Sequence, residues 1–182
     1  MSFTFRRVVT GHDAAGSAVV ESDEIVHSRP RFAGYDARVA WCTSSFPPSN
    51  EAMFAVAEDG PSTRGGRVLF RIGEFQPGDV VPSNMHRTET QDVAVVVSGR
   101  LDMVLDSGEV VESLGSGDVV VQRGTMHSWA VRGDEPVRVV FVLMDAQPLR
   151  VGDTELSEDV SVFDGRLHPM LTSGPSPAPP TR

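Results

Sequence analysis

Residues 77–99 read PGDVVPSNMHRTETQDVAVVVSG, and residues 117–129 read GDVVVQRGTMHSW. Each stretch begins at a Gly-Asp turn and combines a β-branched run with a histidine. From residue 66 to residue 145, similar short runs are separated by glycine turns at a spacing of roughly 8–12 residues, which is typical of antiparallel sandwiches and small barrels. No segment has the pattern of a long amphipathic helix. The sequence therefore predicts an all-β protein whose chemistry lies in these two stretches.

Composition limits the classes of partner. The chain has 182 residues, 16 basic and 25 acidic, with a net charge of −9. Nucleic acids and anionic membranes bind clustered Lys and Arg, so neither is an expected partner. The single cysteine, Cys42, cannot form an internal disulfide. Because no signal-peptide pattern and no long apolar run are found, we predict one soluble, cytoplasmic protein.

Three regions follow one another along the chain. Residues 1–65 contain predicted strands, an irregular segment over 22–35 and a Pro47–Pro48 arm, and they are expected to pack on the barrel or on a partner subunit. Residues 66–149 form the predicted barrel. Residues 150–182 form a looser extension that is expected to be disordered from about residue 173, where it becomes rich in Pro and Ser.

The order and spacing of the two motifs resemble the cupin superfamily. The family's first motif runs Pro-Gly, five residues, His-x-His, a short gap, Glu, six residues, Gly. Here Pro77-Gly78 precedes Asn84-Met85-His86, and Asp92 precedes Gly99. Asn84 therefore stands where the first histidine usually is, and Asp92 stands where the glutamate usually is.

The second cupin motif, a Gly followed by a short strand, a turn and a His, corresponds to residues 117–127. The resemblance covers about residues 66–145 and implies a double-stranded β-helix, or jelly-roll barrel, with extra N-terminal strands. Known cupins include dioxygenases, decarboxylases, isomerases, lyases and non-catalytic binders. The fold by itself therefore leaves the reaction open.

Strand alternation predicts which side chains meet inside such a barrel. Asn84 and His86 share one strand face, and His127 shares another with Trp129. If the barrel closes, His86, Asp92 and His127 converge. Two imidazoles and a carboxylate suit Fe(II) and also accept Mn, Zn or Ni. We expect these three residues to be both the catalytic residues and the ligands of a divalent transition metal.

Two other functions remain open. A His–Asp pair can transfer protons without a metal, giving an isomerase, a dehydratase or a decarboxylase. The barrel could instead bind a small molecule without catalysis. The leading hypothesis is a metal-dependent cupin enzyme, a dioxygenase, decarboxylase or lyase, acting on a small oxygenated or aromatic metabolite.

Further residues are predicted to contact the substrate, and a second subunit is expected. An arginine is suited to bind a carboxylate, an aromatic ring to stack and an amide to form hydrogen bonds. The predicted substrate-binding residues are Asn84, Arg71, Trp129, Gln122 and Met103. A homodimer is expected because it would cover exposed sheet edges.

Overall fold

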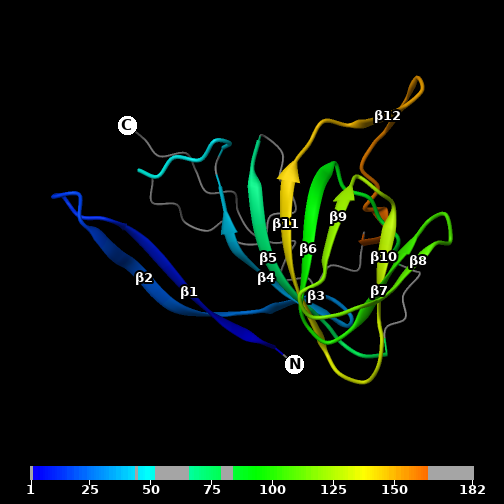
Figure 1. The fold of residues 1–182 in the computed structure, drawn as a ribbon, viewed down its shortest axis with the longest axis horizontal. Helices are drawn as coiled ribbons and strands as arrows, with labels where there is room; N and C mark the ends of the chain where they lie inside the picture. The colour runs from blue at the N-terminus through cyan, green and yellow to red at the C-terminus, as the bar shows by residue number, and fades with distance from the viewer. Residues whose placement is uncertain (1, 44, 52–65, 79–83, 164–182) are drawn as a thin grey trace.

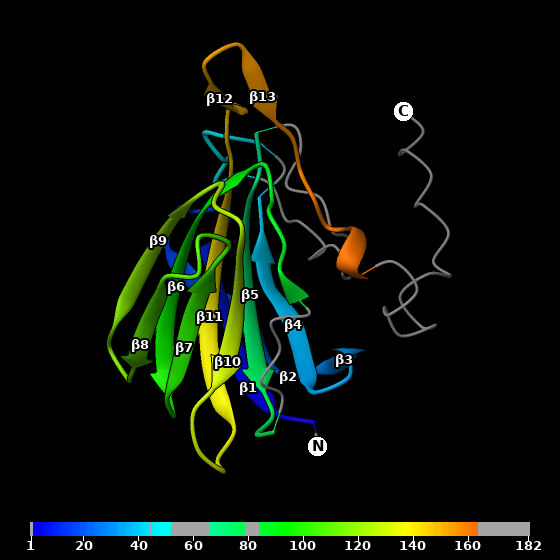
Figure 2. The ribbon, with the colours of Figure 1, turned by 90° about the vertical axis from the view of Figure 1, so that its right-hand side faces the viewer.

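The computed structural model describes residues 2–43, 45–51, 66–78 and 84–163. In chain order the strands are β1 Thr4–His12, β2 Ala18–His27, β3 Arg29–Phe32, β4 Tyr35–Cys42, β5 Val68–Phe75, β6 Thr90–Ser98, β7 Leu101–Leu105, β8 Val110–Leu114, β9 Val119–Arg123, β10 His127–Val131, β11 Val137–Asp145, β12 Leu149–Val151 and β13 Thr154–Leu156. A six-stranded sheet, β3-β4-β5-β11-β6-β9, lies opposite a three-stranded sheet, β10-β7-β8 (Figures 1 and 2). This arrangement confirms the predicted all-β fold of cupin type.

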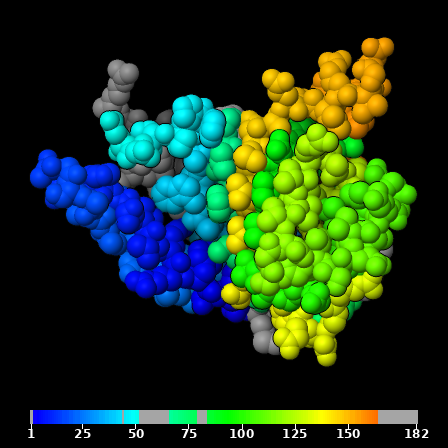
Figure 3. All heavy atoms as spheres, in the orientation of Figure 1, coloured from blue at the N-terminus to red at the C-terminus, as the bar shows by residue number. Residues whose placement is uncertain are grey.

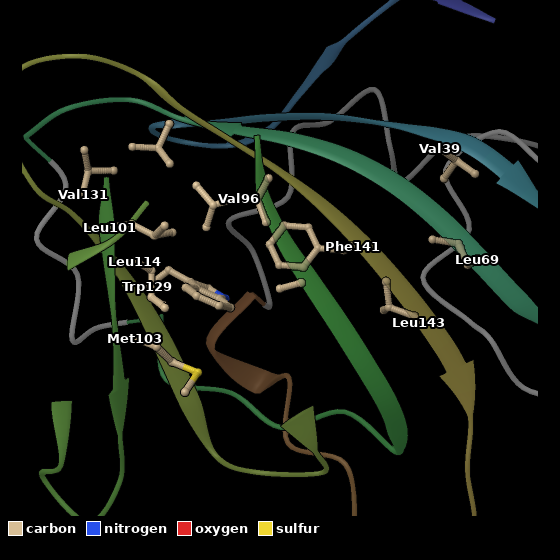
Figure 4. Packing of buried hydrophobic residues seen from close by; sticks show 13 residues of the cluster. Val39, Leu69, Val96, Leu101, Met103, Leu114, Trp129, Val131, Phe141 and Leu143 are labelled. Atoms are coloured by element: carbon tan, nitrogen blue, oxygen red, sulfur yellow. The ribbon is translucent and has the colours of Figure 1, made fainter. Parts of the chain in front are cut away.

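The hydrophobic core lies between the two sheets (Figure 4). Alternation along β6 and β11 turns every second side chain inward, so Ala94, Val96, Val137 and Val139 are almost completely buried. Burial of each of the three valines contributes about 1.5–3 kcal/mol. The packed core holds the strands that carry the polar residues of the interior in fixed register.

Gly99, which ends the first motif, shows why that position carries glycine. Its φ of 78° lies in the left-handed region. A Cβ atom there would also lie 2.8 Å from Val137 Cγ2 and 2.9 Å from the carbonyl oxygen of Pro136. The turn from β6 to β7 therefore needs glycine for its dihedral angle and for space.

The N-terminal region contributes to the main sheet more than the sequence indicated. β3 and β4 extend the six-stranded sheet, and the β1–β2 hairpin projects from the rest of the molecule (Figure 3). The prediction that residues 22–35 are irregular is wrong, because β2 continues to His27 and β3 follows it. Pro30 is accommodated because β3 is an edge strand, where a missing N–H costs no ladder bond.

The chain after β11 first forms a hairpin that projects from one end of the barrel and then returns to the barrel over residues 157–163 (Figure 2). β12 and β13 form a hairpin, and a 3-10 turn, η2 Ser161–Phe163, ends the described segment. The backbones of Arg87 and Asp159 exchange two hydrogen bonds of 2.9 Å. The predicted disorder from residue 173 lies outside the described residues. Within the described part of the chain, no helix is long and apolar enough to cross a membrane.

Candidate functional site

His86 and His127 are held together by their own backbones. Each N–H donates to the other's carbonyl at 2.9 Å, and the imidazole centroids lie 4.4 Å apart. The Nδ1 atoms lie 2.8 Å and 2.9 Å from the carbonyl oxygens of Asn84 and Thr125, respectively. A carbonyl can only accept, so each Nδ1 carries the proton and each Nε2 keeps its lone pair.

Burial disfavours the charged form of both histidines. Burial lowers the pKa of His127 to about 4, and the neighbouring His86 lowers it further than burial alone would. Burial likewise lowers the pKa of His86, and the charge of Arg71 acts in the same direction. In the neutral rings the two Nε2 atoms are therefore hydrogen-bond acceptors, which can accept from a substrate hydroxyl or from another donor.

Asp92 lies on β6, directly opposite Gln122 of β9, with 6% of its surface exposed. Burial raises the pKa of its carboxyl to about 6, against the opposing effects of nearby hydroxyls and of Arg71. Its Oδ2 accepts a long hydrogen bond of 3.4 Å from the Thr88 hydroxyl, which itself accepts one of 2.7 Å from Thr90. Its Oδ1 is buried and has no partner among the described residues.

Arg71 lies on β5 opposite Phe141 of β11, on the strand face away from Phe70 and Ile72. Its charge lowers the pKa values of His86 and Asp92, which places its guanidinium within electrostatic range of both. Its Nε is buried and has no hydrogen-bond partner within the described part of the chain, and the same holds for both amide atoms of Gln122. Buried polar atoms are normally satisfied, so these groups indicate a place for a ligand or for ordered water.

Aromatic rings form a closed circuit of neighbours in the barrel. Successive ring centroids lie between 4.4 Å and 6.3 Å apart. In order, the rings are His86, His127, Trp129, Phe141, Phe75, Tyr35, Phe32 and Phe163, which returns to His86. Burial raises the pKa of Tyr35, on the far side of this circuit from His127, and the charges of Arg71 and Arg31 oppose that rise.

The sequence did not predict that the C-terminal extension contributes a ring to this circuit. It also predicted substrate contacts for three residues whose described contacts are with the protein itself. Phe163 packs edge-on against His86 from the C-terminal extension, and nothing local in the sequence indicates that contact. Trp129 and Met103 lie opposite each other on β10 and β7 and belong to the hydrophobic core, where Trp129 contacts His127. Asn84 contributes its backbone carbonyl to the orientation of His86.

The predicted metal ligands meet only in part. The described residues contain no group of three His, Cys, Asp or Glu side chains placed to hold one metal ion. His86 and His127 offer two Nε2 donors, whereas Asp92 lies in register with Gln122 and Leu143, with its Oδ2 toward Thr88. This donor set does not fit the facial site of two histidines and one carboxylate.

Two fungal proteins show the similarity of this chain to known sequences. Phomopsin biosynthesis cluster protein C' of Diaporthe leptostromiformis is 37% identical over 164 residues, covering 81% of this chain and 82% of that protein. The cupin-domain-containing oxidoreductase srdB of Neurospora crassa is 34% identical over 160 residues, covering 85% and 80%.

The family model described as the cupin domain matches residues 71–143. Among solved structures, the cupin domain of Schizosaccharomyces pombe Cnp3 aligns over 77% of this chain and 87% of its own, with a TM-score of 0.45 and 10% identity. The matched segment includes Arg71, Asp92, Gln122 and His127. The sequence relatives and the family model together show that this chain belongs to the cupin superfamily.

Proposed function

We propose that the chain is a biosynthetic enzyme that moves a proton on a small, planar, oxygen-bearing substrate held inside the barrel. The observation that carries this proposal is Asp92, a buried carboxyl with a free Oδ1 and a pKa raised to about 6. A group whose pKa lies near the working pH can both take and return a proton. Perturbed carboxyls of this kind gather at functional sites.

In the proposed step, ionised Asp92 removes a proton from the carbon next to a substrate carbonyl. The C–H electron pair moves onto the carbonyl oxygen, which becomes an enolate. The Arg71 guanidinium, within electrostatic range of Asp92, stabilises the new negative charge. Protonated Asp92 then returns the proton to another atom of the substrate, which gives isomerisation, or to a departing hydroxyl, which gives dehydration.

The surroundings of Asp92 support a planar, anionic or enolisable substrate. The aromatic circuit offers ring faces and edges for stacking. The Nε2 atoms of His86 and His127 can accept hydrogen bonds from substrate hydroxyls, and the unsatisfied amide of Gln122 can donate and accept. The names of the relatives, which place some of them in biosynthesis clusters, support a role in small-molecule biosynthesis.

Phenylpyruvate is a suitable probe because it combines an aromatic ring, a carboxylate and an acidic carbon next to a carbonyl. We expect the protein to accelerate exchange of that carbon-bound hydrogen in D2O, measured by NMR. Asp92→Asn should reduce the rate about 10²–10⁴-fold. Arg71→Met should lower kcat as well as raise KM, because it removes both the charge that stabilises the enolate and the group that binds the substrate carboxylate.

Asp153→Asn is the matched control, since Asp153 is an exposed carboxylate in the turn between β12 and β13. It should leave the exchange rate unchanged. Equal rates in the wild type and in Asp92→Asn would contradict the proposal, as would exchange by the wild type no faster than in buffer.

A metal-dependent cupin oxidoreductase is the second candidate. It is favoured by the lone pairs of the two histidine Nε2 atoms, because backbone carbonyls fix the tautomers of both rings, as in many metal sites. Three relatives that align with most of this chain are named cupin-domain-containing oxidoreductases. A divalent Fe, Mn, Zn or Ni ion would supply Lewis-acid or redox chemistry. Because a third described donor is missing from the group, we derive no step through a metal.

A further inference from the structure

A groove of about 390 Å³ lies at the end of the barrel where β6 begins and β9 ends. The β12–β13 hairpin contributes Leu149 and Leu156 to its wall. Leu149 is 43% exposed, and Arg123, which also lines the groove, is exposed, so water reaches it. The described residues that line the groove include neither Asp92 nor the two histidines. The groove is therefore distinct from the site described above.

Two threonines of the groove wall also belong to the hydrogen bonds of Asp92. The Thr88 hydroxyl donates to Asp92 Oδ2 at 3.4 Å, and the Thr90 hydroxyl donates to the Thr88 hydroxyl at 2.7 Å. Thr90 and Asp92 lie two residues apart on β6 and are both buried, so their side chains share the inner face of that strand. A row of oxygen atoms thus connects the buried carboxyl with residues that border a groove open to water.

The two oxygens of Asp92 have different surroundings. Oδ2 accepts from the row of hydroxyls, whereas Oδ1 is buried and has no partner among the described residues. A buried carboxyl that serves only the fold normally has both oxygens hydrogen-bonded. The arrangement instead leaves Oδ1 for a substrate and directs Oδ2 to the hydroxyls that lead to the groove.

We infer that Thr88 and Thr90 form a proton relay between Asp92 and water in the groove, through which the carboxyl exchanges protons with solvent while a substrate occupies the barrel. This inference rests on the proposed function of Asp92. A threonine hydroxyl is both a donor and an acceptor, so it can accept one proton while it gives up its own. The two threonines act through Asp92 and are therefore positioning residues.

Each transfer in the relay moves a proton between oxygen atoms and oxidises or reduces nothing. Ionised Asp92 takes a proton from the substrate carbon, and a half-turn of the carboxyl about its Cβ–Cγ bond brings that proton to Thr88; this torsion is broad and two-fold. The proton passes to the Thr88 oxygen, the Thr88 proton passes to Thr90, and the Thr90 proton passes to a groove water. A proton from the groove returns by the reverse route. The hydrogen that Asp92 gives back therefore comes from solvent.

The test follows deuterium through the proposed reaction, with the full chain and phenylpyruvate that carries deuterium on the carbon next to the carbonyl. Borate traps the enol, whose absorbance reports how often the C–D bond is broken. Mass spectrometry of the remaining ketone reports how often solvent hydrogen has replaced deuterium, after subtraction of the exchange in buffer. We expect the wild type to lose deuterium from the ketone. In Thr88→Val/Thr90→Val the deuterium lost per enol formed should fall at least about tenfold, while enol formation continues.

Matched variants separate the hydroxyls from the shape of the side chains. Valine has the branched shape of threonine without the hydroxyl. Thr88→Ser/Thr90→Ser keeps both hydroxyls and should restore the wild-type ratio. Thr154→Val is the control, since Thr154 is an exposed threonine of β13, and it should leave the ratio unchanged. If the double valine variant does not fold, Thr88→Val alone interrupts the relay at its contact with Asp92.

A second measurement needs no substrate and separates this inference from the proposed function. In a ¹³C NMR titration, the Asp92 carboxyl carbon of the wild type should move as one sharp signal, because the relay exchanges its proton rapidly. In the valine variants the signal should broaden or split near its midpoint, because the ionised and protonated forms interconvert slowly.

The outcomes of the two measurements are distinguishable. A wild type that forms no enol would contradict the proposed function alone, and the line shape of the Asp92 signal would then decide the inference. An unchanged line shape in the folded valine variants overturns the inference, as does an unchanged deuterium ratio where enol is formed. An equal loss in the serine variant or in Thr154→Val also overturns it, because the hydroxyls of Thr88 and Thr90 would then not be the cause.

Discussion

At the scale of single residues, burial shifts Asp92 and His127 in opposite directions. It raises the pKa of the carboxyl to about 6 and lowers the pKa of the imidazole to about 4. In both cases the neutral form is the one that the barrel interior favours. The interior therefore admits polar groups while resisting their charges, which is the condition under which a carboxyl can exchange protons near neutral pH.

The first prediction concerns the pH dependence of stability. Folded Asp92 has a raised pKa, so its neutral form stabilises the fold below pH 3.8 and that contribution is lost as pH rises through about 6. At 1.36 kcal/mol per pKa unit, the loss is about 3 kcal/mol. The free energy of unfolding is measured by urea titration for Asp92→Asn and for the wild type. The value for Asp92→Asn should rise relative to that of the wild type by about this amount between pH 4 and pH 7.

His127 gives the opposite prediction over almost the same window. Its depressed pKa means that stability is complete above pH 6.5 and is lost as pH falls through about 4, again by about 3 kcal/mol. The free energy of unfolding of His127→Gln should thus rise relative to that of the wild type as pH falls. A stability difference that does not change with pH in either variant would show that the residue is not shifted by burial.

The sequence predicted the positions of these residues better than their partners. Period-2 alternation was sufficient to separate Arg71 from the face of β5 that carries Phe70 and Ile72, and to put His127 on one face of β10 with Trp129. It could not show that Asp92 lies across from Gln122, because strand pairing is a property of the closed sheet. The expectation of a three-ligand group depended on that pairing.

At the scale of elements, a glycine on β5 leaves room for a side chain of the neighbouring strand β4. Gly73 lies opposite Ala37, and a Cβ atom at residue 73 would overlap the hydroxyl and ring of Tyr35. Gly73→Ala should therefore displace the Tyr35 ring and destabilise the protein by about 1–3 kcal/mol, as overpacking does. Thermal unfolding measures this directly.

Gly115→Ala is the matched control for that substitution. The atom nearest to a Cβ at residue 115 is Arg100 Nη1, at 3.6 Å, which is ordinary contact. Its melting temperature should stay close to that of the wild type. Equal effects of the two substitutions would mean that Tyr35 does not need the space at residue 73.

The C-terminal turn supplies another prediction at this scale. Phe163 of η2 covers the edge of the His86 ring, with centroids 4.9 Å apart. Phe163→Ala should expose His86 to water and raise its pKa toward the ordinary value, as followed by the imidazole NMR signals. Phe46→Ala, at a side chain that is 72% exposed, should leave the titration unchanged. An unshifted His86 in Phe163→Ala would show that the turn does not shield the site.

Most strands could be predicted from the sequence. The elements whose contacts link residues far apart in the sequence could not. β-branched runs and glycine turns indicated β4 to β11 because both signals are local. β3 was missed because Pro30 normally argues against a strand, and its tolerance depends on its edge position. The hairpin and turn after residue 149 were missed because their contacts with Arg87 and His86 link residues about seventy positions apart.

At the scale of the whole molecule, the barrel carries its proposed chemistry without a complete metal-ligand set among the described residues. We therefore predict that treatment with a chelator, followed by dialysis, changes hydrogen exchange of phenylpyruvate by no more than about twofold. The dialysed protein is compared with protein reconstituted anaerobically with Fe(II), Mn(II), Zn(II) or Ni(II). Recovery of activity only with one metal, at one ion per chain, would favour the oxidoreductase candidate instead.

Asp92 is the residue on which the proposed function depends, and its carboxyl can be titrated without knowledge of the substrate. The most direct test is a ¹³C NMR titration of aspartate carboxyl carbons in chelator-treated protein, with the Asp92 signal assigned by its absence from Asp92→Asn. The account predicts a midpoint at about 6, with the signal moving as a single group. A midpoint at or below the ordinary value of 3.8 would contradict it, because Asp92 would then remain ionised and could not return a proton near neutral pH.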